Sequence, residues 1–183
     1  YGFHQAISSS ASDYTWAAGE IANLQVYLVR KELESKNARF VLTNQDGTVF
    51  LTSSVLNEVY DNQRWNLAIS VRPDKYELVG NVISPTLPTY TLEFYGVTHA
   101  FDTIQSEFLL TKSLSYDSGS SFLSNAKRFY VGAHVTNYTG AVAQQSDIQV
   151  GSFRLYEDYL DKTIIRQHNL DPSNYGLKED TRP

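Results

Sequence analysis

The chain has 183 residues, of which 42% are hydrophobic and 13% aromatic, and its formal net charge is −5. That length suits one β-domain, which buries roughly two-thirds of its unfolded surface without covalent cross-links. Lys and Arg form no run that would favour a nucleic-acid partner, no apolar stretch approaches the roughly 20 residues of a membrane-spanning helix, and the lack of cysteine excludes disulfides and thiolate metal sites.

The first half of the chain has the pattern of short strands separated by polar turns. Apolar and β-branched residues predict strands at the N-terminus and over residues 14–18, 24–30, 38–43, 48–52, 65–72 and 76–83. Asp46-Gly47 between two of these runs is typical of a hairpin turn. Trp65, Leu67 and Ile69 alternate with small or polar residues, which predicts a strand with one buried face that includes Trp65.

The second half continues this pattern and ends with a helix. Strands are predicted over residues 90–98, 107–114, 127–135 and 147–156, and a loop is predicted over 116–121. The apolar parity changes at Gly151-Ser152, which predicts a β-bulge. Asp161 has the position of an N-cap for a helix that Asp171-Pro172 ends.

Together these elements predict one all-β domain over residues 1–176, a jelly-roll β-sandwich of two antiparallel sheets with one short C-terminal helix. Residues 177–183 are interpreted as a tail or linker. Because the chain contains no methionine, we expect it to be a processed piece of a longer protein. The absence of cysteine is ordinary for a bacterial or viral protein that works outside cells.

The chain resembles the concanavalin A-like lectin/glucanase superfamily, in particular its laminin G-like members. The features that carry the resemblance are Trp65-Asn66-Leu67-Ala68-Ile69, the strand over 90–97, Tyr130-Val131-Gly132-Ala133, and the strand over 147–156 followed by a helix. The ending over 165–176 is similar to laminin G-like modules of bacteriophage structural proteins. The resemblance implies an extracellular or virion-surface location and a lectin-like role in carbohydrate binding or in a viral structural protein.

Glycoside hydrolysis is the first catalytic role to weigh, because glucanases share the implied fold. A retaining mechanism needs two carboxyl groups about 5 Å apart, which those enzymes place at alternate positions of one strand. Here Glu93 stands alone on its strand, and Asp102 and Glu107 follow too far along. The cluster of Glu157, Asp158 and Asp161 suits a solvated helix N-terminus. We therefore expect no enzyme, and the alternative is a carbohydrate-active enzyme or its accessory carbohydrate-binding domain.

Other catalytic and metal sites also lack a sequence signature. The four histidines are far apart, and no Gly-x-Ser-x-Gly nucleophile elbow occurs. Neither a hydrolytic triad nor a zinc site is therefore predicted. Calcium is the metal that the loops could hold, and its candidate ligands are Asp46, Asp102, Asp117 and Asp147. Most such aspartates simply close turns, so the expected cofactor is none.

Two loops have the composition of a ligand-binding surface. The candidate binding residues are Tyr116, Asp117, Asn137, Tyr138, Gln144 and Gln145, since a tyrosine ring can stack on a sugar while amides bind its hydroxyls. Ordinary turn chemistry, with a tyrosine covering the sheet, is the competing interpretation. The predicted function is a non-catalytic binding or structural module of a larger assembly. Its partners would be glycans or neighbouring protein chains. The chain could also form an oligomer in this role.

Overall fold

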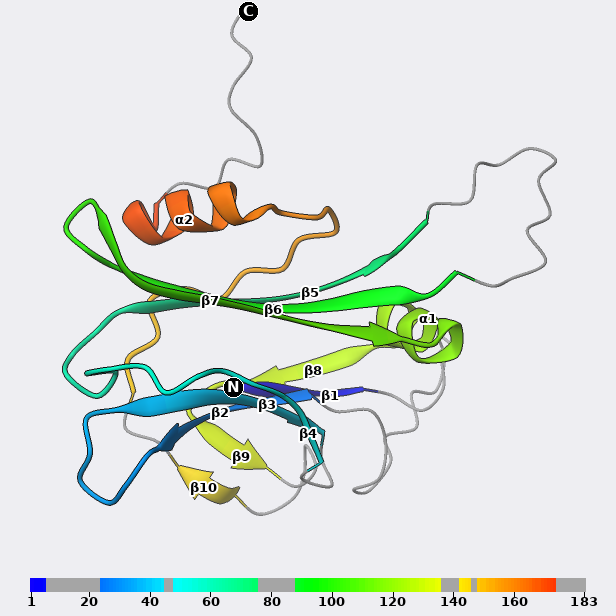
Figure 1. Ribbon diagram of the computed structural model, residues 1–183. Coiled ribbons are helices and arrows are strands. Elements are labelled where there is room, and N and C mark those ends of the chain that lie inside the picture. Colours follow the sequence, from blue (N-terminus) through cyan, green and yellow to red (C-terminus); the bar gives the residue numbers. More distant parts are fainter. Residues whose placement is uncertain (6–23, 45–47, 76–87, 136–141, 146–147, 174–183) are drawn as a thin grey trace, which may run out of the picture.

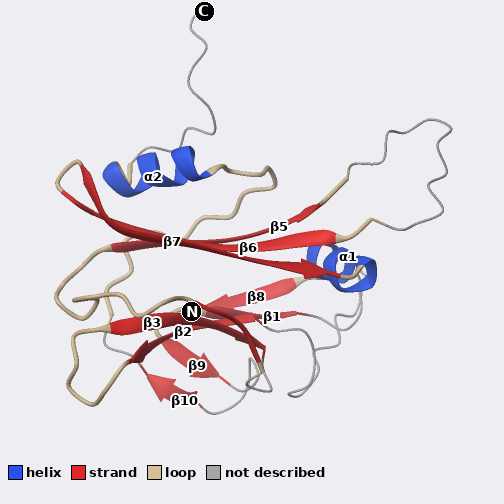
Figure 2. Ribbon diagram, viewed as in Figure 1, coloured by secondary structure: helices blue, strands red, loops and turns tan. Residues whose placement is uncertain are grey.

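A computed structural model describes residues 1–5, 24–44, 48–75, 88–135, 142–145 and 148–173. Two antiparallel sheets pack face to face as a β-sandwich, and a helix covers the outer face of the smaller sheet (Figure 1). Strands greatly outnumber helices in this part of the chain (Figure 2). The predicted all-β sandwich is therefore correct.

The larger sheet has five strands in the order β4-β3-β2-β1-β8. Their bounds are β1 Gly2–Gln5, β2 Leu24–Arg30, β3 Ala38–Asn44, β4 Val49–Thr52 and β8 Lys127–Tyr130. Strand β1 pairs with both β2 and β8, so a segment at the N-terminus lies between two strands that are about 100 residues apart in the sequence. The predicted hairpin of β3 and β4 is confirmed by their antiparallel pairing.

The smaller sheet has the order β5-β6-β7, with β5 Trp65–Pro73, β6 Tyr90–Ala100 and β7 Thr103–Leu114. Its register places Trp65 opposite Thr98 and Ile69 opposite Phe94. The alternation predicted for β5 is confirmed, because Trp65, Leu67, Ile69 and Val71 all pack against the core between the sheets. Trp65 itself is half-buried rather than fully buried.

The core between the sheets is built from alternating strand positions of both and from two residues of the connection between β4 and β5. Its buried residues are Phe3, Leu24, Val26, Ala38, Phe40, Leu42, Leu56, Val59, Leu92, Phe94 and Phe108. Phe40 on one sheet stacks on Phe108 of the other, with ring centroids 5.3 Å apart. Aromatic pairs of this kind join the two layers.

A second, smaller cluster lies on the outer face of β6. There Tyr95 and Val97 pack against Ile165 of α2, which spans Lys162–Leu170. The helix begins as its sequence predicted, since the Asp161 carboxylate accepts a hydrogen bond from the Ile164 backbone N at 3.0 Å. The β5-β6-β7 sheet is thus covered on both faces, which the alternating pattern alone did not indicate.

The predicted loop over 116–121 is wrong, because helix α1 spans Tyr116–Ser124. Ser115 caps it by accepting a hydrogen bond from the Ser118 backbone N at 3.3 Å. Gly119 packs directly on the Tyr90 ring, where a side chain would collide. Serines and glycine are poor helix formers, so contact with the sheets outweighs the local preference. The described residues therefore contain two helices where one was predicted.

Two predicted strands near the C-terminal end also need correction. The strand over 127–135 is divided at Gly132, whose φ of 80° turns the chain. Strand β9, Ala133–Val135, then pairs with β10, Val142–Gln145, outside the two large sheets. Residues 148–161 form neither strand nor helix, so the predicted strand over 147–156 and its bulge are wrong.

The apolar side chains of residues 148–155 explain why a strand was predicted there. Phe153 packs on Phe129 of β8, with ring centroids 5.0 Å apart, but it and the neighbouring apolar residues stay about half exposed. Four sequence predictions lie outside the described residues: the strands over 14–18 and 76–83, the Asp46-Gly47 turn and the tail over 177–183.

Candidate functional site

One end of the sandwich gathers three connections, which we call the loop end. It consists of residues 31–37 between β2 and β3, residues 53–64 between β4 and β5, and the turn Phe101-Asp102 between β6 and β7. All three lie at the left of Figure 1, whereas α1 lies at the opposite end. Connections at one end of a rigid sandwich are a common location for binding residues.

The first two connections are fastened to each other. The backbone N of Tyr60 donates to the Lys36 carbonyl at 3.0 Å, and that of Glu58 donates to Asn37 Oδ1 at 3.0 Å. An ion pair joins Lys36 Nζ to Asp61 Oδ1 at 2.8 Å. Hydrogen bonds in both directions between Ala38 and Leu56 complete the contact. The loop end is therefore held by its own contacts as well as by the strands.

Backbone strain is concentrated at the loop end. Among the described residues, the non-glycine residues with positive φ are Glu34 (68°), Glu58 (56°), Asn62 (56°) and Phe101 (55°). All of them lie in the three connections. The left-handed region is unfavourable for residues with a Cβ atom, most of all for bulky ones. Such strain collects at functional sites more often than elsewhere.

The loop end also presents two large apolar side chains to solvent. Leu33 is 94% exposed and Phe101 is 98% exposed, the highest values among the large hydrophobic residues that the structure describes. Each stands at the tip of its connection, where it contributes nothing to the core. Single exposed apolar residues are common, but full exposure of a phenylalanine together with a positive φ is not.

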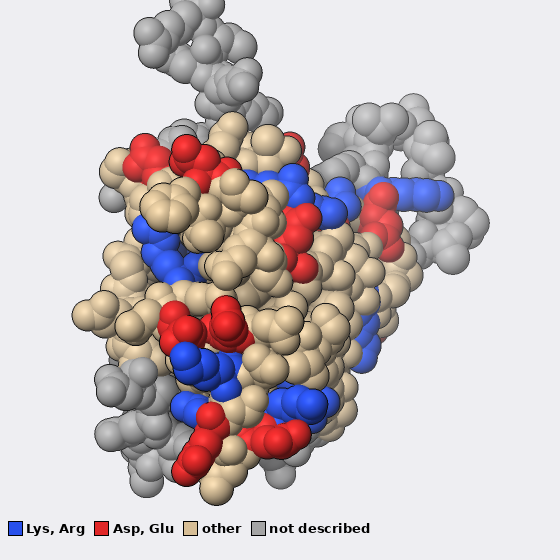
Figure 3. Space-filling view, turned by 60° about the vertical axis from the view of Figure 1, so that its left-hand side comes forward, with Lys and Arg blue, Asp and Glu red and all other residues tan. Residues whose placement is uncertain are grey.

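Charges at this end are mixed. Figure 3 turns the end forward and shows acidic and basic side chains side by side, with no gathering of one sign. Lys36 pairs with Asp61, and Lys31 Nζ lies 3.8 Å from Glu32 Oε1. The guanidinium of Arg30 lies 4.0 Å from the centroid of the Tyr60 ring. An apolar contact here would be surrounded by polar and charged groups.

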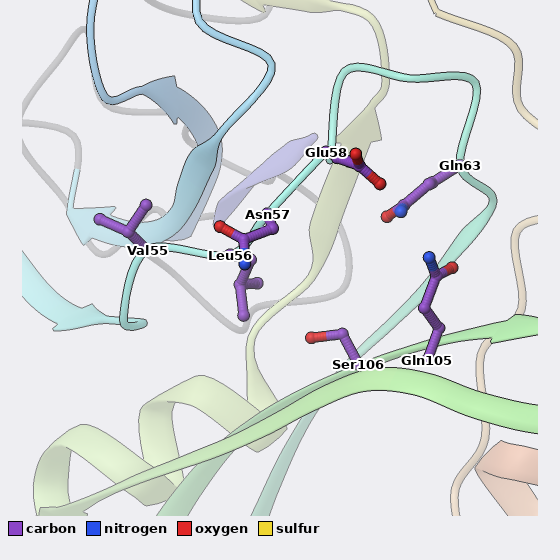
Figure 4. Close-up of a pocket in the computed structure, with 7 residues that line it drawn as sticks. All are labelled: Val55, Leu56, Asn57, Glu58, Gln63, Gln105 and Ser106. Carbon is purple, nitrogen blue, oxygen red and sulfur yellow. The ribbon is translucent and has the colours of Figure 1, made fainter.

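A pocket of about 330 Å³ opens between residues 53–64 and the start of β7. The residues that line it are Val55, Leu56, Asn57, Glu58, Gln63, Gln105 and Ser106. Figure 4 shows the polar ends of Glu58, Gln63 and Gln105 turned toward one another. Trp65 Nε1 donates to Gln63 Oε1 at 3.2 Å, which fixes the orientation of that amide.

The outer face of the β5-β6-β7 sheet holds the other group of polar residues that could carry chemistry. Glu93 accepts from Arg72 Nη2 at 3.0 Å and from the Tyr159 hydroxyl at 3.0 Å. Glu107 accepts from the Tyr95 hydroxyl at 2.7 Å and from Arg166 Nη2 at 2.6 Å. Each carboxylate is thus bound by one guanidinium and one tyrosine.

These contacts determine how the groups titrate. Hydrogen bonds from Arg166 and then Tyr95 hold the pKa of Glu107 below its usual value. Burial, followed by the hydrogen bond to Glu107, raises the pKa of Tyr95 to about 12. Burial and then the nearby charge of Arg166 lower the pKa of His99. A general acid needs a raised carboxyl pKa, so Glu107 is tuned against that role.

His99 and the carboxamides of Asn169 and Asn66, which lie beside these carboxylates, form hydrogen bonds between α2 and the rest of the chain. The amide Nδ2 of Asn169 lies 2.7 Å from His99 Nδ1, and the Asn169 carbonyl accepts a hydrogen bond from Arg64. The amide of Asn66 donates to the Ile165 carbonyl at 3.0 Å. These bonds attach α2 to the sheet, so this face is occupied by the chain itself.

The candidate binding residues from the sequence do not form one surface. Tyr116 and Asp117 lie in the first turn of α1. The Tyr116 ring packs against the Tyr90 ring, with ring centroids 6.1 Å apart. Gln144 and Gln145 belong to β10, which lies away from α1 in Figure 1. Asn137 and Tyr138 lie outside the described residues.

The calcium candidates are likewise dispersed where they can be placed. Asp102 lies in the β6–β7 turn and Asp117 at the opposite end on α1, while Asp46 and Asp147 lie outside the described residues. Within the described ranges, no group of three or more His, Asp or Glu residues could hold a metal ion. No helix in those ranges is long and apolar enough to cross a membrane.

Sequence reasoning missed the loop end. The available signal was Ala100-Phe101-Asp102 between two strongly alternating runs, which requires a tight turn with a phenylalanine at its tip. The pocket had no such signal, because Gln63 and Gln105 come together only through the packing of the sheets. Family models, curated proteins and solved structures were each compared with the chain, and none matches it.

Proposed function

We propose that this protein is a non-catalytic binding and structural module that contacts another protein chain of a larger assembly through its loop end. The observation that supports it best is Phe101, which is 98% exposed and has a φ of 55°. The side chain gains nothing from burial, and the backbone would be less strained with glycine. A residue that lowers stability in this way is best explained by a contact with something outside the chain.

The composition of the loop end favours a protein partner. Stable protein interfaces combine a few apolar or aromatic anchors with a polar rim. Phe101 and Leu33 have the exposure of such anchors, and the paired charges Lys36–Asp61 and Lys31–Glu32 have the place of a rim. Leu33 has no ring face or polar atom with which to bind a sugar, so an end of the sandwich that exposes Leu33 as well as Phe101 suits a protein surface better than a glycan.

The kind of assembly follows from the laminin G-like resemblance, which includes modules of bacteriophage structural proteins. We place the protein, as part of this proposal, on a virion surface or appendage, with jelly-roll connectivity in its sandwich. A non-catalytic role is supported by Glu107, whose carboxylate is held ionised by Arg166 and Tyr95. The carboxylate of Glu93 is likewise engaged, by Arg72 and Tyr159.

Site-specific photo-crosslinking tests the proposal. A photo-reactive phenylalanine analogue is placed at position 101 in the protein within its native assembly, and the adducts are identified by mass spectrometry. The matched control carries the analogue at Leu123, an exposed apolar residue of α1 at the opposite end. We expect a discrete protein adduct from position 101 that Leu33→Asp weakens, and little from position 123. Equal labelling at both positions would refute a contact through the loop end.

A further inference from the structure

We propose that the free edge of β7 pairs with β7 of a second copy of this chain, so that two β5-β6-β7 sheets join into one continuous antiparallel sheet. This surface runs along the side of the sandwich, whereas the protein contact proposed above lies at its loop end (Figure 1). Neither Phe101 nor Leu33 belongs to β7. The two contacts therefore use different parts of the molecule.

Strand β7 has the longest free edge among the outer strands of the two large sheets. Within the described residues its backbone hydrogen-bonds to β6 alone, so every second N–H and C=O group points away from the sheet. It has 12 residues, whereas β4 and β8 have four each, and β5 ends in Pro73, which has no N–H to donate. A long free edge is a template on which another strand can pair.

The two charged residues of β7 are already engaged within the chain. The Glu107 carboxylate is bound by Arg166 and Tyr95 over the outer face of the sheet. Lys112 turns toward the other sheet, where its Nζ lies 4.4 Å from the centroid of the Phe50 ring. Each charge thus has a partner of its own, and neither is left to face a second strand alone.

Leu109, near the middle of β7, is the residue that such a pairing would bury. It is 38% exposed and belongs to neither of the two apolar clusters of the sandwich. The side chain therefore contributes little to the fold of a single copy. Two Leu109 side chains that meet across a dimer axis would remove each other from water, which favours association.

Two-fold symmetry limits how two copies of β7 can pair. Opposite residues of an antiparallel pair point to the same face, so the axis passes through one residue that faces its own copy. With Leu109 on the axis, Phe108 lies opposite Leu110 and Glu107 lies opposite Thr111. Apolar residues then meet apolar residues, and no like charges stand opposite each other, as a stable cross-strand pairing requires.

The neighbouring registers lack this complementarity. An axis at Phe108 would place the charged Glu107 opposite Leu109, and an axis at Glu107 would set two carboxylates against each other. An axis at Leu110 would place Phe108 opposite Lys112. The sequence of β7 is thus self-complementary in one register, which an unrelated strand would match only by chance. This property favours a second copy as the occupant of the edge.

Sedimentation equilibrium of the purified chain at about 5 to 500 µM tests the association, because this range detects micromolar dissociation constants. A strand-edge interface is small, so we expect a reversible dimer of micromolar affinity. Leu109→Lys should weaken the dimer by about tenfold, since it opposes two like charges on the axis. The matched control is Leu155→Lys, at an exposed apolar residue near Phe153, which packs against β8. It should associate as the wild type does.

Single cysteine variants report the register, because the chain has no cysteine of its own. Leu109→Cys should give a covalent dimer with a short bifunctional maleimide, since residue 109 faces its own copy. Ser113→Cys is the control on the same face of β7. Its two copies would lie eight residues apart along the paired strands, roughly 26 Å, so it should remain uncrosslinked.

Several outcomes would overturn the proposal: a monomer at every concentration, equal association of the two lysine variants, or equal crosslinking of the two cysteine variants. A dimer that Leu33→Lys abolishes and Leu109→Lys leaves intact would also overturn it and would assign the association to the loop end. Photo-crosslinking at position 101 is measured in the native assembly. Its result can therefore fail or succeed independently of the β7 dimer.

Discussion

Arg166 on α2 binds Glu107 on β7 through its Nη2 atom, which lies 2.6 and 2.8 Å from the two carboxylate oxygens. The Tyr95 hydroxyl donates to the same carboxylate at 2.7 Å from the neighbouring strand. The three residues come from α2, β7 and β6, so one network attaches the helix to two strands. A charge-assisted network of this kind is stronger than the single bonds that it contains.

Removal of the Arg166 side chain should loosen α2. We expect Arg166→Ala to lower the free energy of unfolding by about 1 kcal/mol, since the pair is about one-third exposed and solvent screens part of its attraction. Urea denaturation measures the change. The control is Lys31→Ala, which removes a pair that is far more exposed and has a separation of 3.8 Å. Equal losses in the two variants would contradict a special role for Arg166.

The same network predicts an acid dependence of stability. Arg166 and Tyr95 hold the pKa of Glu107 below its usual value of 4.5, so the folded state binds this proton less tightly than the unfolded state does. The stabilisation is therefore complete above the unfolded pKa and is lost as the pH falls through the folded pKa. The difference in unfolding free energy between wild type and Glu107→Gln should stay constant down to about pH 5 and shrink in more acidic solution. A difference that grows in acid would show the reverse linkage.

Gly96 and Gly151 form a matched pair for testing the core. A Cβ atom at Gly96 would collide with the Phe108 ring and lie 2.9 Å from Leu67 Cδ2, whereas one at Gly151 would meet nothing within 4 Å. We expect Gly96→Ala to lower the free energy of unfolding by about 1–3 kcal/mol through overpacking. Gly151→Ala should change it by less than about 0.5 kcal/mol. Thermal unfolding followed by circular dichroism compares them, and similar midpoints would mean that β6 and β7 are not packed as described.

Phe101 and Leu33 allow the backbone and side-chain contributions at the loop end to be separated. Both are almost fully exposed, but only Phe101 has a positive φ. Phe101→Gly should therefore raise the free energy of unfolding by about 0.5 kcal/mol, because the relief of backbone strain outweighs the freedom that glycine adds to the unfolded chain, and no packing is lost. Leu33→Gly should lower it by about 0.5–1 kcal/mol, since glycine only adds freedom to the unfolded chain. Calorimetry distinguishes the two signs, and a loss in both variants would argue against strain at Phe101.

The sequence by itself determined the features that depend on near neighbours. The alternation from Trp65 to Val71 specified which face of β5 meets the core, because successive side chains of a strand point to opposite faces. Asp161 specified where α2 begins, because its carboxylate binds a backbone N–H only three residues ahead. Such signals act within a few residues and need no knowledge of the rest of the chain.

Only the tertiary structure decided the features that depend on distant partners. Helix α1 forms from weak helix formers because Gly119 fits against Tyr90 and Phe122 packs on Phe3, with ring centroids 5.2 Å apart. Residues 148–155 have strand-like composition yet form no strand. The loop end and its pocket arise because the stacking of two sheets brings three separate connections to one end of the sandwich. Contacts of this range are set by how the layers pack, and no local pattern encodes them.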